Sequence, residues 1–218
     1  MATLEADGIW LAFGERKILQ SIYLRMDTGQ VLGLLGRNGC GKSCLLQTVF
    51  GTLRAENQSV RIDGKFIEYP YQKARLIRYL PQHSFVPLSL KIKDAFEMYQ
   101  VDFEPITTRF ESLKKYKNSI FRELSGGEKR LLETLLILLS PVQFVLLDEP
   151  FSGVSPVWIE EIKKLIVEQK SQKGILISDH QYGHVLNLSD HIYLLQTGGS
   201  LYRLSNPETE LRDRGYLR

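Results

Sequence analysis

Residues 36–43 read GRNGCGKS and fit the spacing G-x-x-x-x-G-K-[ST], which is typical of loops that hold the phosphates of a nucleotide. The glycines of this loop are Gly36, Gly39 and Gly41. Without side chains, the backbone can curl so that its N–H groups point inward at an anion. We expect the Lys42 ammonium to reach the β- and γ-phosphates and the Ser43 hydroxyl to bind Mg²⁺.

The segments on either side of this loop fit the same interpretation. Residues 29–36 form a short apolar run that predicts a strand, and residues 42–54 predict a helix. The N-terminal end of that helix would add positive charge at the phosphates. The remaining expected contacts come from the side chains of the loop and of the first helical turn, Asn38, Cys40 and Cys44.

A second motif, FVLLDEP at 144–150, supplies the expected metal and water chemistry. Its apolar residues predict a buried strand that delivers Asp148 toward the metal, with Glu149 next to polarise an attacking water. Acidic residues at strand ends are common, so this motif indicates a nucleotide site only in combination with the phosphate loop. Together they predict a nucleoside triphosphatase, although a small-molecule kinase also fits these two motifs. An N-K-x-D sequence, which a GTPase would use to read its base, does not occur.

The stretch RELSGGEKRLLETLLILLS (122–140) predicts a leucine-rich helix with two glycines in its first turn. Ser125 and Glu128 have the spacing of a capping box, which explains a well-capped helix but not the glycines. Gly126 and Gly127 would leave the backbone N–H groups open to an anion. Because the chain already has one phosphate loop, we expect this second anion site to share its ligand, with the two sites meeting between two copies of the protein.

Five motifs occur in the order found in ATP-binding cassette (ABC) proteins. LSGGE (124–128) resembles the signature motif of that family. The other four are the phosphate loop, YLPQ at 79–82, FVLLDEP and ISDHQ at 177–181. The resemblance covers nearly the whole chain. It implies a P-loop NTPase core that forms head-to-tail dimers with two ATP molecules between the copies, so that the phosphate loop of one faces the signature of the other.

The resemblance also implies roles for individual residues. Ser125 and Gly127, with Gly126, would hold the γ-phosphate of the ATP bound to the other copy. Gln82 would touch Mg²⁺ and the attacking water and would sense a membrane partner. Glu149 would be the general base, and His180 would contact the γ-phosphate.

The same resemblance predicts an aromatic residue near the start of the chain that stacks on adenine. Phe13 aligns with it in LAFGERKIL (11–19), and Trp10 is the alternative. Two positions depart from the family pattern. Ser155 replaces the usual aspartate in a loop expected to cross the dimer interface. Cys40 lies inside the phosphate loop, where we expect the helix N-terminus to favour a reactive thiolate.

Alternating apolar strands and helices predict an α/β fold with a parallel sheet. Residues 3–26 predict an N-terminal antiparallel layer, and hairpins are expected at 60–69 and 191–205, the latter as part of an added antiparallel layer. We therefore expect one ABC ATPase domain, with an ATP-binding core at 1–82 and 141–218 and a compact helical signature subdomain at 83–140.

Composition narrows the expected partners. The net charge of +3 gives no basic stripe for nucleic acid, and the sequence shows neither a signal peptide nor a membrane span. Two cysteines four residues apart suit a reducing, cytosolic setting. We expect an ATPase subunit, paired with itself or with a paralogous cassette, that lies on the cytoplasmic face of the membrane through a separate transmembrane permease. The alternative is a soluble, non-transport ABC ATPase that acts on ribosomes or DNA.

Overall fold

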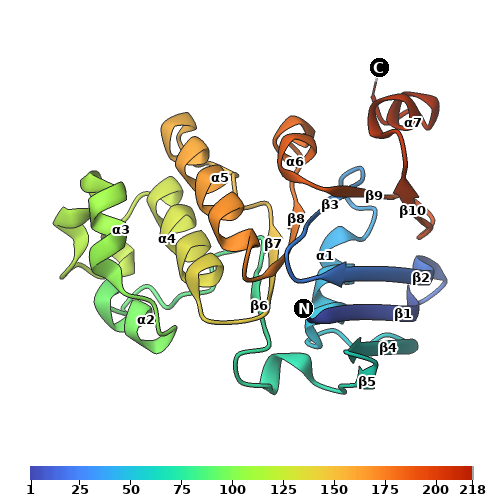
Figure 1. Cartoon of the computed structure of the whole chain (residues 1–218), viewed down its shortest axis with the longest axis horizontal. Helices are drawn as coiled ribbons and strands as arrows, with labels where there is room; N and C mark the ends of the chain where they lie inside the picture. Colours follow the sequence, from blue (N-terminus) through green and yellow to red (C-terminus); the bar gives the residue numbers. More distant parts are fainter. Residues whose placement is uncertain (218) are drawn as a thin grey trace.

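An antiparallel sheet of four strands forms one side of the molecule in the computed structural model, which describes residues 1–217. Its order is β2-β1-β4-β5, and Figure 1 shows it at the right. The strands are β1 (Thr3–Phe13), β2 (Arg16–Asp27), β4 (Asn57–Ile62) and β5 (Lys65–Phe66). The long pair β1 and β2 confirms the expected N-terminal antiparallel layer, and β4 and β5 meet at the expected turn, Asp63-Gly64.

A second sheet of six strands has the order β10-β9-β3-β8-β7-β6. Its strands are β3 (Val31–Leu35), β6 (Ile77–Leu80), β7 (Phe144–Asp148), β8 (Gly174–Ser178), β9 (His191–Leu195) and β10 (Leu201–Leu204). The strands from β9 to β6 are parallel, as predicted, and only β10 is antiparallel. The expectation that the last hairpin joins an added antiparallel layer is wrong, because β9 pairs with β3 and the hairpin extends this sheet.

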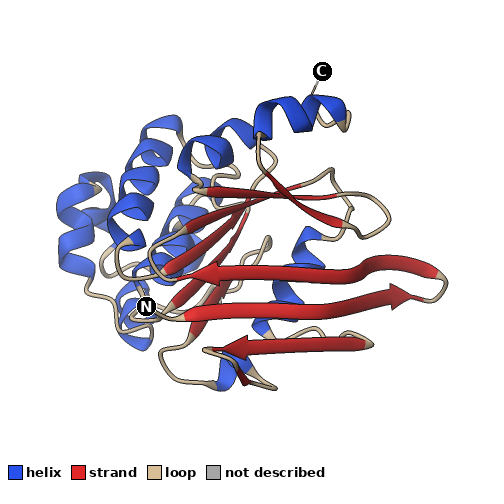
Figure 2. Cartoon of the chain, turned by 45° about the vertical axis from the view of Figure 1, so that its right-hand side comes forward, coloured by secondary structure: helices blue, strands red, loops and turns tan. Residues whose placement is uncertain are grey.

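Seven α-helices are described: α1 (Lys42–Phe50), α2 (Ile92–Met98), α3 (Phe103–Arg109), α4 (Gly126–Leu139), α5 (Pro156–Lys170), α6 (Tyr182–Leu188) and α7 (Pro207–Asp213). The described residues also form three short 3-10 helices: η1 (Pro70–Gln72) between β5 and β6, and η2 (Glu111–Tyr116) and η3 (Phe121–Glu123) between α3 and α4. Figure 2 shows the long antiparallel strands on one side of the main sheet and most helices on the other. Across residues 1–217, each helix is too short or too polar to cross a membrane.

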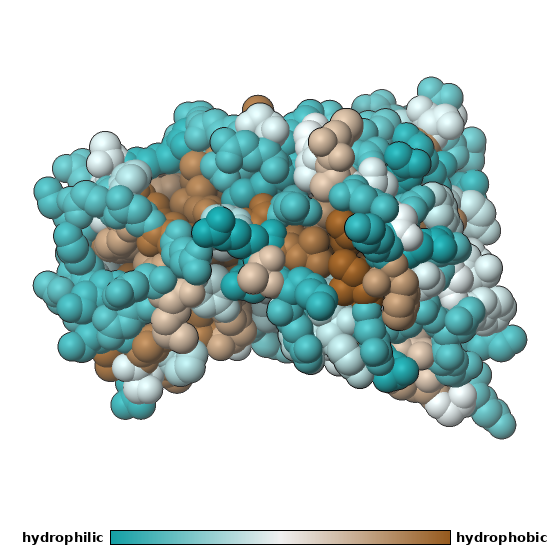
Figure 3. Space-filling view, turned by 60° about the horizontal axis from the view of Figure 1, so that its bottom comes forward, coloured by the Kyte–Doolittle hydropathy of each residue, from teal (hydrophilic) through white to brown (hydrophobic). Residues whose placement is uncertain are grey.

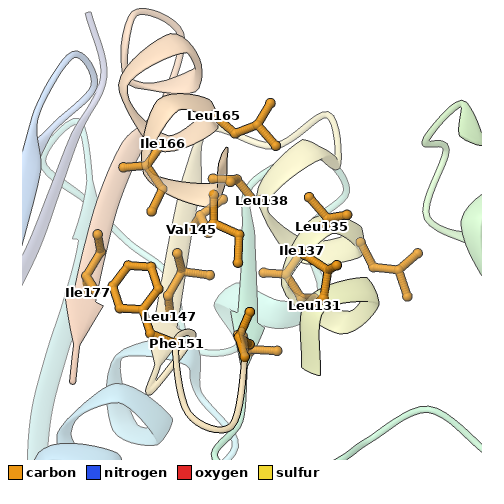
Figure 4. Packing of buried hydrophobic residues seen from close by; sticks show 14 of the residues in the cluster. Leu131, Leu135, Ile137, Leu138, Val145, Leu147, Phe151, Leu165, Ile166 and Ile177 are labelled. Atoms are coloured by element: carbon orange, nitrogen blue, oxygen red, sulfur yellow. The ribbon is translucent and has the colours of Figure 1, made fainter. Parts of the chain in front are cut away.

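Alternating side chains of the main sheet feed two separate hydrophobic cores. On β7, Phe144 and Leu146 pack with the antiparallel sheet and α1, whereas Val145 and Leu147 pack with α4 and α5. Figure 4 shows the second of these cores, with Val145 and Leu147 facing the side chains of the two helices. The main sheet therefore lies between the two cores, because successive side chains of each strand point to opposite faces. The loops that follow its parallel strands leave the sheet at one common edge.

The segment 83–140 is helical and lies at the left of Figure 1. An ionic contact ties its helix α3 to α5: Arg109 donates to Glu161 over 2.9 Å and to both carboxylate oxygens of Glu168 over 2.7 and 2.8 Å. At the far end of α4, the buried Lys173 ammonium donates to the carbonyls of Leu138 and Ser140 over 2.6 and 2.8 Å. These contacts join the helical segment to α5 and to the residue that precedes β8.

Candidate functional site

A cavity of about 620 Å³ lies at the C-terminal ends of β3 and β7. It gathers ten of the residues that the sequence singled out: Phe13, Asn38, Gly39, Gly41, Lys42, Ser43, Cys44, Gln82, Glu149 and His180. Two more residues, Arg16 and Ile18, complete its lining. Residues from four of the five sequence motifs, together with Phe13, thus span more than 160 positions and meet at one pocket large enough for a small-molecule ligand.

The loop between β3 and α1 has the curled backbone that the sequence predicts. Gly41 precedes α1 with φ at +109°, in the region that favours glycine. A Cβ there would lie 2.8 Å from Ile18 Cγ2, so the site excludes a side chain as well. The Lys42 ammonium folds back on the loop and donates to the carbonyls of Gly36 over 2.7 Å and Arg37 over 3.3 Å.

Asp148 lies beneath the cavity and is almost fully buried. Its Oδ2 accepts a hydrogen bond from the Tyr79 hydroxyl over 3.2 Å, and the Ser43 hydroxyl lies near the same carboxylate. Burial raises the pKa of Asp148, while the hydroxyls of Ser43 and Tyr79 partly oppose that shift. A hydroxyl facing the cavity and a carboxylate behind it are hard oxygen donors of the kind that Mg²⁺ prefers, so these residues fit that metal.

Glu149 leaves the end of β7 with a left-handed backbone, at φ +55°. Its N–H donates to the Ser178 carbonyl over 2.6 Å, which holds the residue against the end of β8. The nearest carboxylate oxygen lies 3.8 Å from His180 Nδ1, and that nitrogen lies 3.4 Å from the buried Asp179 carboxylate. A carboxylate and an imidazole thus stand side by side at the mouth of the cavity, where they can move or hold protons.

The two aromatic candidates for an adenine platform separate in the structure. Phe13 is 55% exposed and lines the cavity. Trp10, which is 40% exposed, does not line it. An exposed aromatic face at the edge of a polar pocket can stack on a planar base. The geometry therefore favours Phe13 for this role.

The start of α4 lies outside this cavity. Ser125 and Glu128 form the predicted capping box, with the Glu128 N–H donating to Ser125 Oγ over 3.3 Å and the Ser125 N–H donating to Glu128 Oε2 over 2.9 Å. A Cβ added at Gly126 would meet no heavy atom within 4 Å. The space at this helix N-terminus is therefore open, and the anion site predicted from the sequence stays a prediction.

Gly127 requires a different explanation. A Cβ there would lie 2.4 Å from the carbonyl oxygen of Gly153, in the loop before α5. Close packing within the chain thus excludes a side chain at Gly127, without any ligand. The sequence reasoning assigned both glycines to an anion because a contact between segments so distant in sequence leaves no local pattern.

Cys40 contradicts the expected reactive thiolate. The side chain is only 4% exposed, and burial raises the pKa of its thiol although Lys42 opposes the shift. The desolvation of the thiolate thus exceeds the stabilisation by nearby positive charge. Ser155, the other departure, is exposed and precedes α5 without capping it through its side chain.

Two arginines near the site were not predicted. Arg16 lines the cavity and donates to the Gly39 carbonyl over 3.3 Å. Arg130, on α4, donates to the Glu149 carbonyl over 3.1 Å. Neither arginine belongs to one of the five sequence motifs. Folding brings Arg16 next to the phosphate loop and Arg130 next to the end of β7.

Comparison with known proteins agrees with these motifs. Residues 19–152 match the sequence profile of the family described as ABC transporter. A probable ABC transporter ATP-binding protein of Azorhizobium caulinodans is 32% identical over 221 residues, which cover 95% of this chain and 78% of that relative. The lipopolysaccharide export system ATP-binding protein LptB of Escherichia coli K12 is 30% identical over 213 residues, with coverages of 91% and 88%.

Solved structures share the fold. The ATP-binding subunit of an ABC transporter superposes with a TM-score of 0.83 at 22% identity, covering 97% of this chain and 93% of that one. An ATP-binding cassette of an ABC transporter in its ADP conformation gives a TM-score of 0.74 at 25% identity, with coverages of 98% and 95%. The arrangement of the two sheets and the helical segment is therefore that of these cassettes.

Proposed function

The chain belongs to the ABC transporter family of ATP-binding proteins, and from this premise we propose that it is the ATP-hydrolysing subunit that drives a separate transmembrane partner. Cassettes of this family are ATPases, and this one has the residues for that reaction. The observation that carries the proposal is the convergence of Lys42, Glu149 and His180 on one cavity. In the proposed assembly the chain lies on the cytoplasmic face of the membrane through its partner.

Each group at the cavity has a proposed part in hydrolysis. Lys42 and the N–H groups of its loop bind the phosphates of ATP, and Phe13 stacks on adenine. Mg²⁺, held by Ser43, Asp148 and Gln82, would neutralise phosphate charge. Glu149 accepts the proton of the attacking water, and His180 contacts the γ-phosphate.

The proposed dimer follows from the place of α4. Ser125, Gly126 and Gly127 do not line the cavity of their own chain. The N-terminal end of α4 nevertheless has free space at Gly126 and an attractive field for an anion. We propose that a second copy, or a paralogous cassette, brings its ATP to this helix end, so that two ATP molecules lie between two head-to-tail copies.

A groove of about 530 Å³ beside Gln82 supports the proposed membrane partner. Apolar and aromatic side chains dominate its lining, namely Phe50, Tyr79, Pro81, Phe85, Met98, Tyr99 and Ile137. Figure 3 turns the bottom of Figure 1 forward and shows apolar side chains on both sides of a hydrophilic band. A short helix of the partner would fit such a groove. Pro81 lines the groove and precedes Gln82, so a movement of that helix would reach Gln82 through Pro81.

ATP-dependent dimerisation of Glu149→Gln tests the proposed assembly, with size-exclusion chromatography and light scattering as the measurement. The substitution removes the base and retains the shape, so ATP should trap a dimer that disappears when Ser125→Arg is added. A monomer at saturating ATP would contradict the head-to-tail pairing. Co-purification with a multi-span membrane protein supports transport, whereas co-sedimentation with ribosomes would contradict it.

A further inference from the structure

One buried arginine of helix α4 contacts the segments that follow β6 and β7. Arg130 is 6% exposed and spreads its guanidinium over three main-chain carbonyls. It donates to the Pro81 carbonyl over 2.6 Å, to the Glu149 carbonyl over 3.1 Å and to the Asp148 carbonyl. The planar fork of an arginine suits this task, because its donors have fixed directions. The residue thus ties the end of β6 to the end of β7.

These carbonyls belong to the segments that carry the proposed catalytic groups. Pro81 immediately precedes Gln82, and Glu149 has the strained φ of +55°. A left-handed backbone at a residue other than glycine costs free energy and persists where its surroundings hold it. The Arg130 bond to the Glu149 carbonyl and the Glu149 N–H bond to Ser178 hold this residue from both sides.

One turn along the same helix, a buried carboxylate fixes the other side of Gln82. Glu133 is 1% exposed, and its Oε1 accepts from the N–H groups of Phe85 over 3.1 Å and Val86 over 3.3 Å, as well as from the Ser84 hydroxyl. These three donors immediately follow the segment that contains Gln82. A carboxylate that accepts several main-chain hydrogen bonds acts as a rigid anchor for a loop.

We infer that Arg130 and Glu133 are positioning residues for ATP hydrolysis, which hold Gln82 between two anchors on α4 and fix the backbone of Glu149. Neither side chain lines the ATP cavity, and their hydrogen bonds to residues outside α4 go to 81–86 and 148–149. Their loss should therefore misplace the catalytic groups and leave the phosphate loop intact. The inference rests on the ATPase activity, with Gln82 and Glu149 in the roles proposed above.

The test separates catalysis from ATP binding. In Arg130→Met we expect kcat to fall about 10- to 100-fold, the size of effect that a misplacement near 1 Å can produce, whereas the Kd for ATP changes less than about threefold. Arg130→Lys should give an intermediate kcat, since one ammonium cannot reproduce the fork. Glu133→Gln keeps an acceptor oxygen and should be milder than Glu133→Leu, which leaves its donors unpaired.

Arg109→Met is the matched control, because Arg109 also makes three side-chain hydrogen bonds but makes them between α3 and α5. It should lower thermal stability with kcat unchanged. Amide exchange over 82–86 gives a local readout and should accelerate in the Arg130 and Glu133 variants but not in Arg109→Met. The largest effect is expected at Phe85 and Val86 in Glu133→Leu, because their N–H groups donate to Glu133. A folded Arg130→Met with the kcat of the unaltered protein would overturn the inference, and so would a parallel loss of kcat and ATP affinity. If Arg130→Met does not fold, unchanged kcat in both Arg130→Lys and Glu133→Leu would overturn it.

Discussion

The carbonyl oxygen of Gly153 lies 2.4 Å from the position that a Cβ of Gly127 would occupy. The first turn of α4 therefore packs directly on the loop between β7 and α5. A Cβ on the adjacent residue, Gly126, would meet no heavy atom within 4 Å. Close packing therefore requires glycine at 127 but not at 126, and substitutions can distinguish the two positions.

Gly127→Ala should destabilise the fold by roughly 1–3 kcal/mol, because the added methyl overpacks against a main-chain atom. Gly126→Ala should leave stability unchanged or raise it by up to about 1 kcal/mol, as helix propensity alone predicts. Urea unfolding measures both. Equal effects at the two positions would contradict the role of the Gly153 contact.

Phe13→Ala should weaken ATP binding by about 1–3 kcal/mol, the usual loss when an aromatic platform for a base is removed. Trp10→Ala is the matched control on the same strand, since Trp10 does not line the cavity. Titration calorimetry without hydrolysis, on the Glu149→Gln background, gives the two affinities. A larger loss in Trp10→Ala would move the adenine site away from Phe13.

Asp148→Asn should stabilise the nucleotide-free protein at neutral pH and abolish hydrolysis. Burial raises the pKa of Asp148 above its unfolded value, so the folded state binds this proton more tightly. The stability associated with that proton is present below the ordinary carboxyl pKa of about 4 and is lost as pH rises through the raised value. The advantage of the variant should therefore be small at acid pH and largest at neutral pH.

Unfolding in urea at pH 4.5 and 7.5 measures this difference. Asp213→Asn, at an exposed aspartate, is the control and should show little difference between the two pH values. A destabilised Asp148→Asn at pH 7.5 would mean that the Tyr79 hydrogen bond and the nearby Ser43 hydroxyl outweigh the cost of burying the charge.

Lys173 should make stability depend on pH in the alkaline range. Burial lowers the pKa of Lys173 to about 8, below its unfolded value near 10.4. Between these values the unfolded state binds more protons, so the contribution of this group to the free energy of unfolding rises with pH. The stability of the unaltered protein relative to Lys173→Met should therefore increase from pH 7.5 to pH 10. A constant difference would show that Lys173 stays charged in the folded state.

The sequence predicted most of the fold because short apolar strands and glycine turns leave local patterns. Helices α6 and α7 were missed, since each has only seven residues and few buried positions. The last hairpin was placed in the wrong layer, because residues 191–195 have the same apolar pattern whether they pair with β3 or with a separate sheet.

The candidate site shows the same division. Lys42, Ser43 and Glu149 lie in motifs whose spacing carries their chemistry, and the structure brings them together. Arg130 and the Gly127 contact depend on segments that meet only in the folded chain. The ionisation of Cys40 depends on how deeply its thiol is buried, and the sequence shows the favourable helix end but not that burial.

Helix α4 connects the two nucleotide sites of the proposed dimer. In the proposed dimer its first residues meet the nucleotide of the other copy, and Arg130 follows Ser125 by five positions, about 7.5 Å along a helix. A shift of this one rigid helix would move groups at both nucleotides. Such a dimer would hydrolyse ATP cooperatively, with a Hill coefficient for ATP above one. One inactive copy would then abolish hydrolysis at both sites.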